Sequence, residues 1–421
     1  MVYRVHAAPS VGVGFLAKDP WAPAFRREQM IARQLVRRGM EVRFVQAPAD
    51  WRRLRTDPGN WARHVGRASW ASPLPGVTVT ERSTVLAGHR NPLAERLDAA
   101  LLSRFLHRSH WAPELTVSML PWEWRATRQL AGRRVFDCTD DWTRLLPQAR
   151  GLPDQLRRVA DEADEVVVVN EVLAGLFPGR SPLVVPNGTD EELLREPRVA
   201  ERAERSAVYV GSIAGRFDVE LVRGVLGALP DWTLTVYGQL VFSDRERPAA
   251  ERFQALAADF PGRFSHRGVL PRDRLADVLD AATVALLPDV ADRALGQSSM
   301  KSYDYCARGL PIVATAGHLE HSNDLPPHTA VVSGPDEMAA AVLAAAEEPA
   351  DRAAVRTAWA ADRTWDRRTD AWLAACLGGA VQPGGLRPGP RSVCADVHPG
   401  APTCSAICSG VDGAYPHEVA S

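Results

Sequence analysis

The chain has 421 residues, and its 50 basic and 51 acidic residues leave a net charge of −1. This length exceeds what one hydrophobic core usually supports, so two domains are expected. The balanced charge excludes a surface made chiefly for nucleic acid, and no apolar run approaches the roughly 18 residues that predict a membrane-spanning helix.

The first part of the chain alternates short apolar runs with amphipathic segments. The expected strands are 11–17, 42–47, 77–80, 116–120, 134–137, 165–169 and 183–185. The expected helices are 25–39, 91–107 and 152–163. The valine run within 166–169 lacks polar alternation, as expected of a central parallel strand that is covered on both faces.

A charged segment at 191–205 separates this series from a second one. The expected strands there are 207–211, 233–237, 264–267, 283–287, 312–314 and 330–332, and the expected helices are 219–229, 249–259, 272–281, 299–308 and 336–347. Such alternation predicts parallel sheets with helices on both faces. We therefore expect an α/β protein of two Rossmann-like, doubly wound domains, 1–190 and 206–349, joined by the linker 191–205.

A last helix is expected over 350–377, where Trp365 and Trp372 share one face, and it should pack back against the body. Residues 378–421 are rich in Gly, Pro and Ser and lack periodicity, which predicts a disordered tail. The six cysteines show no C-x-x-C spacing, and the N-terminal residues do not form a signal peptide. These features predict a cytoplasmic protein.

The most informative segment is 298–315, which predicts a short helix running into a buried strand. Ser298 or Ser299 supplies the N-cap. Lys301 places a cation in the first turn, where the helix dipole favours anions, and a bound diphosphate would explain it. Asp304 lies on the same face and can accept hydrogen bonds from a sugar hydroxyl. A network of charged side chains within the helix is the alternative.

Other candidate residues lie in loops that follow strands, because ligands of open α/β sheets bind beyond the carboxyl ends of strands. Gly211 and Gly215 allow a ligand to approach the backbone, and Arg216 can pair with phosphate oxygens. A solvated arginine after a turn is the alternative. Asp140 and Asp141 can bind acceptor hydroxyls or act as a base. Capping of a turn explains these two carboxylates equally well.

Residues 12–17 match the letters of a dinucleotide fingerprint, G-x-G-x-x-A. The fingerprint must follow a strand and open a helix, whereas Pro9 and Ser10 precede this match and Pro20 closely follows it. An NAD-dependent oxidoreductase is therefore disfavoured. Segments 18–27, 51–70 and 120–125 are rich in Trp and Arg, which suits either sugar stacking or packing within the fold.

In their order along the chain, these motifs resemble those of the GT-B-fold glycosyltransferases, specifically the family 4-like group of retaining enzymes. The resemblance covers about residues 11–375. The motifs that carry it are VPNGTD at 185–190, VGSIAGR at 210–216, FSHRGV at 264–269, LLP at 286–288, KSYDYCARGLPIVAT at 301–315 and TWDR at 364–367.

The resemblance implies that the first domain binds an acceptor and the second a nucleotide-diphosphate sugar, with no metal or other cofactor. Asp304 stands where the family has a glutamate that holds the ribose hydroxyls, while Arg216 and Lys301 would stabilise the leaving diphosphate. The implied donor-binding set is Gly211, Ser212, Gly215, Arg216, His266, Gly268, Ser298, Ser299, Lys301 and Asp304. The implied catalytic set is Arg216, Lys301, Asp140 and Asp141, and the implied acceptor-binding set is Asp19, Trp21, Trp122 and Asp141.

We therefore expect a bacterial, cytoplasmic, retaining and metal-independent glycosyltransferase of saccharide or natural-product biosynthesis. Its expected partners are a nucleotide-sugar donor and a saccharide or small-molecule acceptor, without nucleic acid or a transmembrane segment; peripheral membrane contact is compatible with the sequence. Gly296 stands where the family often has the first of two glutamates. This departure keeps open a GT-B-fold nucleotide-sugar epimerase and a non-catalytic nucleotide-sugar-binding relative.

Overall fold

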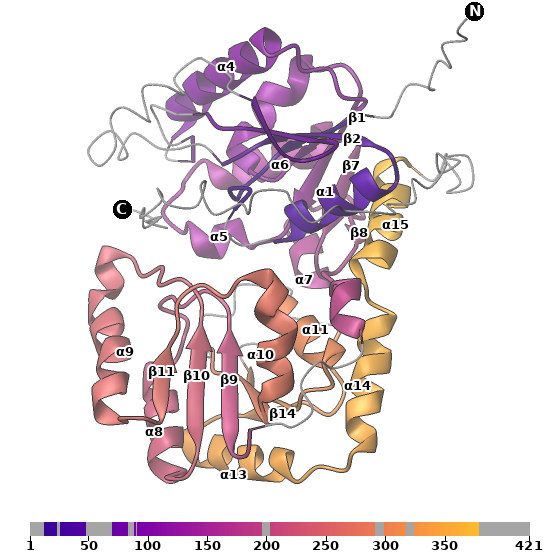
Figure 1. Ribbon diagram of the computed structural model, residues 1–421. Helices are drawn as coiled ribbons and strands as arrows, with labels where there is room; N and C mark the ends of the chain where they lie inside the picture. The colour runs from indigo at the N-terminus through magenta and orange to yellow at the C-terminus, as the bar shows by residue number, and fades with distance from the viewer. Residues whose placement is uncertain are drawn as a thin grey trace, which may run out of the picture.

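The computed structural model describes residues 12–22, 26–47, 70–82, 88–89, 91–195, 203–290, 299–316 and 324–378. Within them the chain forms two α/β units, one above the other in Figure 1. Ser298, Gly296, segment 51–69 and the tail beyond Gly378 lie outside the described residues, so the predictions made for them stay predictions.

The first unit is built on an eight-stranded sheet with the order β3-β4-β2-β1-β5-β6-β7-β8. Its strands are β1 (Gly12–Leu16), β2 (Glu41–Val45), β3 (Trp70–Leu74), β4 (Val77–Thr80), β5 (Leu115–Ser118), β6 (Arg133–Cys138), β7 (Glu165–Val168) and β8 (Leu183–Val184). All neighbours pair in parallel except β3 and β4. Strand β3 was not predicted, because it is an edge strand that contains Pro73 and has no buried apolar face.

Helices cover both faces of this sheet. They are α1 (Arg27–Arg37), α4 (Pro92–Arg108), α5 (Trp142–Leu145), α6 (Leu152–Glu162), α7 (Glu171–Ala174) and the 3₁₀ helix η1 (Pro121–Gln129). The start of α4 is fixed locally, since Asn91 accepts a hydrogen bond from the Ala94 amide and Pro92 occupies the first position. Segment 120–125, which the sequence shows to be rich in Trp and Arg, forms the N-cap and the start of η1.

The second unit has a six-stranded, fully parallel sheet with the order β11-β10-β9-β12-β13-β14. Its strands are β9 (Ser206–Val210), β10 (Thr233–Tyr237), β11 (Phe264–His266), β12 (Val284–Leu287), β13 (Ile312–Thr315) and β14 (Ala330–Val332). In chain order this is the 3-2-1-4-5-6 arrangement of a doubly wound fold, whose switch point lies between β9 and β12. The predicted fold class is confirmed.

The remaining helices are α8 (Val219–Ala228), α9 (Arg247–Asp259), α10 (Leu275–Ala281), α11 (Met300–Ala307) and α13 (Pro335–Ala346), with the short 3₁₀ helices η2 (Glu191–Leu194), η3 (Asp244–Glu246) and η4 (Arg272–Arg274). Helix α11 follows β12 in the chain and begins near the switch point. The predicted helix 272–281 is thus divided into η4 and α10.

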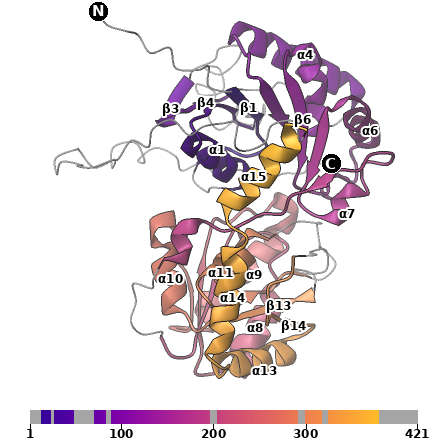
Figure 2. The ribbon, with the colours of Figure 1, turned by 90° about the vertical axis from the view of Figure 1, so that its right-hand side faces the viewer.

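The single helix predicted over 350–377 is two helices, α14 (Asp351–Ala361) and α15 (Trp365–Cys376). The break occurs because Thr364 caps α15 and its neighbours bond to the segment between the units: Thr189 donates to the Arg363 carbonyl (3.0 Å) and its carbonyl accepts from Trp365 (2.8 Å). Figure 2 shows α14 along the second unit and α15 along the first. Trp365 and Trp372 are buried in the first unit's core.

Candidate active site

The loops that follow β9, β10 and β11 lie at one edge of the second sheet, and the arrowheads in Figure 1 show that this edge faces the first unit. The backbones of these loops are in direct contact with one another. The Gly238 amide donates to the Gly268 carbonyl at 2.7 Å, and a side chain at Gly238 would lie 1.9 Å from the Gly211 carbonyl oxygen. His266 Nε2 lies 2.8 Å from the Gly238 carbonyl oxygen, so this predicted donor-binding histidine supports the loop.

Lys301 lies across the predicted glycine loop. A side chain on Gly211 would meet its Cε at 2.2 Å, so a larger residue here would displace the end of the lysine side chain. The ammonium is 5.2 Å from the centroid of the Tyr209 ring, within range of a cation–π interaction. Burial, and after it the charge of Arg216, lower the pKa of Lys301 to about 7.

Arg216 is the second cation of this site. Its charge acts on the Tyr209 hydroxyl and on Lys301, and its carbonyl accepts from the Val290 amide at 2.8 Å. That contact joins the Gly215–Arg216 loop to the loop after β12, where Asp289 partly offsets the two cations by raising the pKa of Lys301. Sequence reasoning missed Asp289, although a carboxylate directly after a buried strand was the signal.

The N-terminus of α11 lies beside these cations. Ser299 is the N-cap residue, yet its side chain makes no capping bond. Within the described part of the chain, the hydroxyls of Ser299 and Ser302 are buried without a hydrogen-bond partner. A first helical turn also leaves backbone N–H groups unsatisfied. Together with Lys301, this turn offers several donors to an anion.

Asp304 lies one turn further along α11, where it is buried. Its Oδ1 accepts a hydrogen bond from the Thr189 hydroxyl at 2.9 Å, and burial raises its pKa to about 6. Thr189 belongs to the segment that joins the two units, so Asp304 also supports their connection. A ribose hydroxyl bound at this position would share the Asp304 carboxylate with the Thr189 hydroxyl, which already donates to it.

The facing wall of the first unit carries two of the predicted acceptor-side carboxylates. Lys18 Nζ lies 2.6 Å from Asp140 Oδ2 and 3.5 Å from Asp19 Oδ2, and Arg26 is 3.4 Å from Asp19. The charge of Arg26 contributes to the lowered pKa of Lys301, so this wall comes close to the second unit's cations. The structure thus brings Asp19 and Asp140 together, with two cations that the sequence did not single out.

Glu28, in the first turn of α1, was also missed. It is 1% exposed, and among the described residues neither of its carboxylate oxygens has a hydrogen-bond partner. Burial, followed by the charge of Asp19, raises its pKa to about 8, so the side chain is largely protonated at neutral pH. In the sequence, a glutamate at this place is an ordinary helix-start residue.

Three predicted acceptor residues make structural contacts within the first unit. Asp141 caps α5, accepting from the Thr143 amide at 3.0 Å. Trp122 packs edge-on against Trp142, and Trp21 packs against Phe44, with ring centroids 5.1 and 5.2 Å apart. Both predicted tryptophans are buried. These contacts agree with the capping and packing alternatives.

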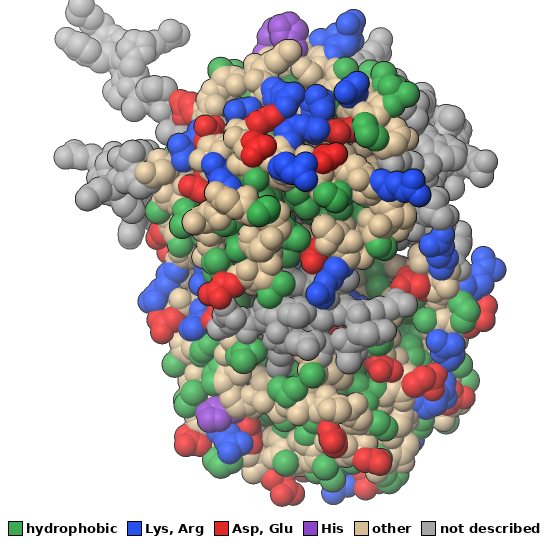
Figure 3. All heavy atoms as spheres, turned by 180° about the vertical axis from the view of Figure 1, so that it is seen from behind, with side chains coloured by type: hydrophobic (Ala, Val, Ile, Leu, Met, Phe, Trp, Pro, Cys, Tyr) green, Lys and Arg blue, Asp and Glu red, His purple; other side chains and the backbone are tan. Residues whose placement is uncertain are grey.

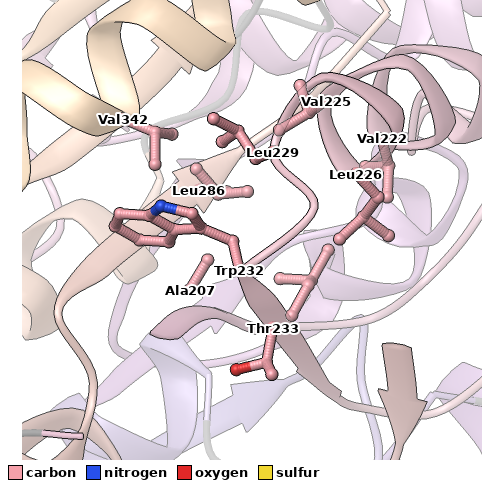
Figure 4. A pocket seen from close by; sticks show the side chains of 10 residues that line it. Ala207, Val222, Val225, Leu226, Leu229, Trp232, Thr233, Leu286 and Val342 are labelled. Carbon is pink, nitrogen blue, oxygen red and sulfur yellow. The ribbon is translucent and has the colours of Figure 1, made fainter. Parts of the chain in front are cut away.

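A cavity of about 10 Å³ lies at the opposite end of the second sheet, beside the starts of β9 and β10 (Figure 4). Its walls are apolar, including Trp232, Leu286 and Val342, and its volume suits about one water molecule. Ligand binding is therefore not expected there.

Seen from behind, the first unit carries intermixed basic and acidic side chains (Figure 3). Among the described helices, none is both long and apolar enough to cross a membrane.

Comparison with known proteins agrees with this geometry. Residues 219–374 match the family described as glycosyl transferase-like. The sucrose-phosphate synthase of Thermosynechococcus elongatus has a similar structure (16% identity, TM-score 0.58, covering 87% of this chain and 97% of that one). No curated protein sequence matches the chain.

Two further solved structures are similar over the same extent. Anabaena HepE, solved in complex with UDP and glucose, has 15% identity and a TM-score of 0.59, covering 87% of this chain and 99% of that one. The trehalose-6-phosphate synthase OtsA has 12% identity and a TM-score of 0.65, with the same coverage. The chain therefore has the two-domain GT-B fold of these structures, and its second domain matches a glycosyl transferase-like family.

Proposed function

We propose that this enzyme transfers a sugar from a nucleotide-diphosphate sugar to a hydroxyl group of a saccharide or small-molecule acceptor. We further propose a retaining, metal-independent reaction. The alanine- and arginine-rich composition favours a bacterial source, where we propose a cytoplasmic role in saccharide or natural-product biosynthesis. The similar Anabaena HepE structure, which contains UDP and glucose, supports a nucleotide-linked donor.

The observation that carries this proposal is the pair of cations at the start of α11. Arg216 lowers the pKa of Lys301, which means that the two positive charges repel each other in the free protein. Keeping like charges together in a buried place costs free energy unless an anion joins them. A diphosphate would bring two negative charges to Lys301, Arg216 and the free N–H groups of α11.

In the proposed reaction the acceptor oxygen bonds to the anomeric carbon while the bond from that carbon to the diphosphate oxygen breaks. The acceptor proton passes to the departing diphosphate. Arg216 and Lys301 stabilise the negative charge that develops on this leaving group. Asp140 and Asp19, held by Lys18, would orient acceptor hydroxyls on the facing wall. Because two protein cations supply the electrophilic charge, the scheme needs no metal ion.

This arrangement predicts that diphosphate binding weakens as the pH rises above about 7. The pKa of Lys301 is lowered to about 7 in the free protein, so above that pH the amine is mostly neutral and must take up a proton to meet the anion. The dissociation constant should therefore rise by up to about tenfold per pH unit between about pH 7.5 and 9. Calorimetry in buffers of different ionisation enthalpy measures this proton uptake directly. The Lys301→Met variant should lose the slope, and a pH-independent constant in the native chain would contradict it.

The proposed function is tested by nucleotide binding followed by turnover. A panel of UDP, GDP, dTDP, ADP and NADH is screened by thermal shift, where a ligand at 100 times its dissociation constant adds about 2.7 kcal/mol of stability. One nucleoside diphosphate, and not NADH, should raise the melting temperature. The matching nucleotide sugars are then offered with and without acceptor sugars. Transfer only with acceptor supports the proposal, release of nucleotide without acceptor indicates an epimerase-type reaction, and binding without turnover indicates a non-catalytic relative.

A further inference from the structure

Helix α4 exposes apolar side chains on the side that faces away from its own domain. Leu93, Leu97 and Leu101 are 66%, 47% and 49% exposed. They are spaced by four residues and therefore form one line along the helix. The inner face is already filled, since Leu102, Phe105 and their neighbours are part of a buried core cluster. The three exposed leucines therefore do not take part in the packing of α4 against its own domain.

The charged residues of α4 also differ between its two faces, with basic residues outside and acidic residues inside. Arg96, Arg104 and Arg108 are exposed, and no acidic residue shares this outer face. Within the described part of the chain, none of the three arginines forms an ion pair. The two acidic residues of the helix, Glu95 and Asp98, are both buried.

Partners on neighbouring elements hold both buried acids. Arg125 Nε lies 3.3 Å from Glu95, and Arg158 also pairs with it. Arg82 lies 3.3 Å from Asp98. A usual surface helix turns its apolar stripe inward and charges of both signs outward. In α4 the acids are turned inward, which leaves leucines and cations outside.

We propose that this outer face of α4, comprising Leu93, Arg96, Leu97, Leu101, Arg104 and Arg108, docks on a membrane surface that contains anionic lipids. In such docking, a helix lies in the plane of the interface with apolar side chains among the acyl chains and cations at the headgroups. Helix α4, which at 1.5 Å per residue is about 25 Å long, lies at the outer edge of the first domain in Figures 1 and 2, away from the second domain.

The charges favour a lipid surface over a second copy of the chain. Symmetric pairing of two copies would place arginines against arginines, with no acidic residue on the face to neutralise them. An anionic bilayer matches both features of the face at once, because headgroups meet the arginines and the hydrocarbon boundary accepts the leucines. The donor loops of the second domain remain free in this orientation, since they lie at the other end of the first domain.

The test is co-sedimentation of the full chain with vesicles of phosphatidylcholine, with and without about one third phosphatidylglycerol. Two variants address the face: Leu93→Gln with Leu97→Gln and Leu101→Gln, and Arg96→Gln with Arg104→Gln and Arg108→Gln. A matched control, Leu325→Gln with Val331→Gln and Leu343→Gln, changes side chains of the second domain that are 53%, 54% and 49% exposed. Melting temperatures and nucleotide binding, which do not depend on this face, show whether each variant is folded.

The native chain and the control should bind the anionic vesicles at least tenfold more strongly than the neutral ones, and added salt should weaken this binding. Each arginine is expected to contribute about fivefold, so the arginine variant should bind about a hundredfold more weakly. The leucine variant should also lose at least tenfold. Absence of vesicle binding, or an equal loss in the control, overturns the proposal. So does a concentration-dependent dimer that only the leucine variant abolishes, since it would make the face a self-association surface.

Discussion

Replacing Arg216 with alanine is expected to lower kcat by about 10²–10³-fold, the usual effect of removing one preorganised donor from a charge-stabilising site. The charge of Arg216 acts on both Tyr209 and Lys301, and the Arg216 carbonyl accepts from the Val290 amide at 2.8 Å, so the loop that carries this cation is held in place. Because negative charge on a leaving diphosphate grows as the glycosidic bond breaks, Arg216 should act more on turnover than on ground-state binding. The donor dissociation constant should therefore change by less than about tenfold.

Steady-state kinetics with the donor found in the nucleotide screen, together with calorimetric binding, separate the two effects. Arg216→Lys should recover part of kcat, because it keeps the charge but loses the forked geometry. Arg205→Ala serves as the control, since Arg205 forms an exposed pair with Asp231 at 2.9 Å far along the same domain. If turnover of Arg216→Ala matched that of Arg205→Ala, Arg216 would have no part in the mechanism.

The fold could be predicted from the sequence because its signals are local. Buried parallel strands such as β7 and β12 are short continuous apolar runs in the sequence. The start of a helix such as α4 is marked by its N-cap residue and the proline that follows. The failures are equally physical. Strand β3 is held by pairing with β4 and has no local signal. The break between α14 and α15 combines the local cap of Thr364 with contacts to Thr189, which is distant in the sequence.

The candidate site could be predicted in outline, since strand-following loops gather at one edge of a parallel sheet. Lys301, Gly211 and Arg216 do lie together, as the fold requires. The facing wall was harder to predict. Glu28 and Arg26 look like ordinary helix-start residues, and only the folding of the first domain brings Asp19 close to both of them. Asp304 could be placed in the site from its motif, but its hydrogen bond to Thr189 could not be predicted, because Thr189 lies 115 residues away in the sequence.

The second large effect is expected at Asp137, which holds the C-terminal helix to the first domain. Its carboxylate accepts from Arg27 Nε at 3.0 Å and from the Trp372 indole at 3.0 Å. Asp137 and Trp372 are 0% exposed and Arg27 is 2% exposed. Three elements, β6, α1 and α15, therefore meet at one buried carboxylate. Removing it leaves a buried guanidinium without its counter-charge.

Asp137→Ala is expected to lower the free energy of unfolding by about 3–5 kcal/mol, the cost of breaking a buried ion pair from one side. Asp137→Asn should lose less, because the amide oxygen still accepts one hydrogen bond. Guanidinium unfolding followed by tryptophan fluorescence measures both. Asp154→Ala is the matched control: its pair with Arg157 is 65–69% exposed and should contribute no more than about 0.5 kcal/mol. A loss below about 1 kcal/mol for Asp137→Ala would mean that α15 is held by the packing of Trp365 and Trp372 alone, with the ion pair adding nothing.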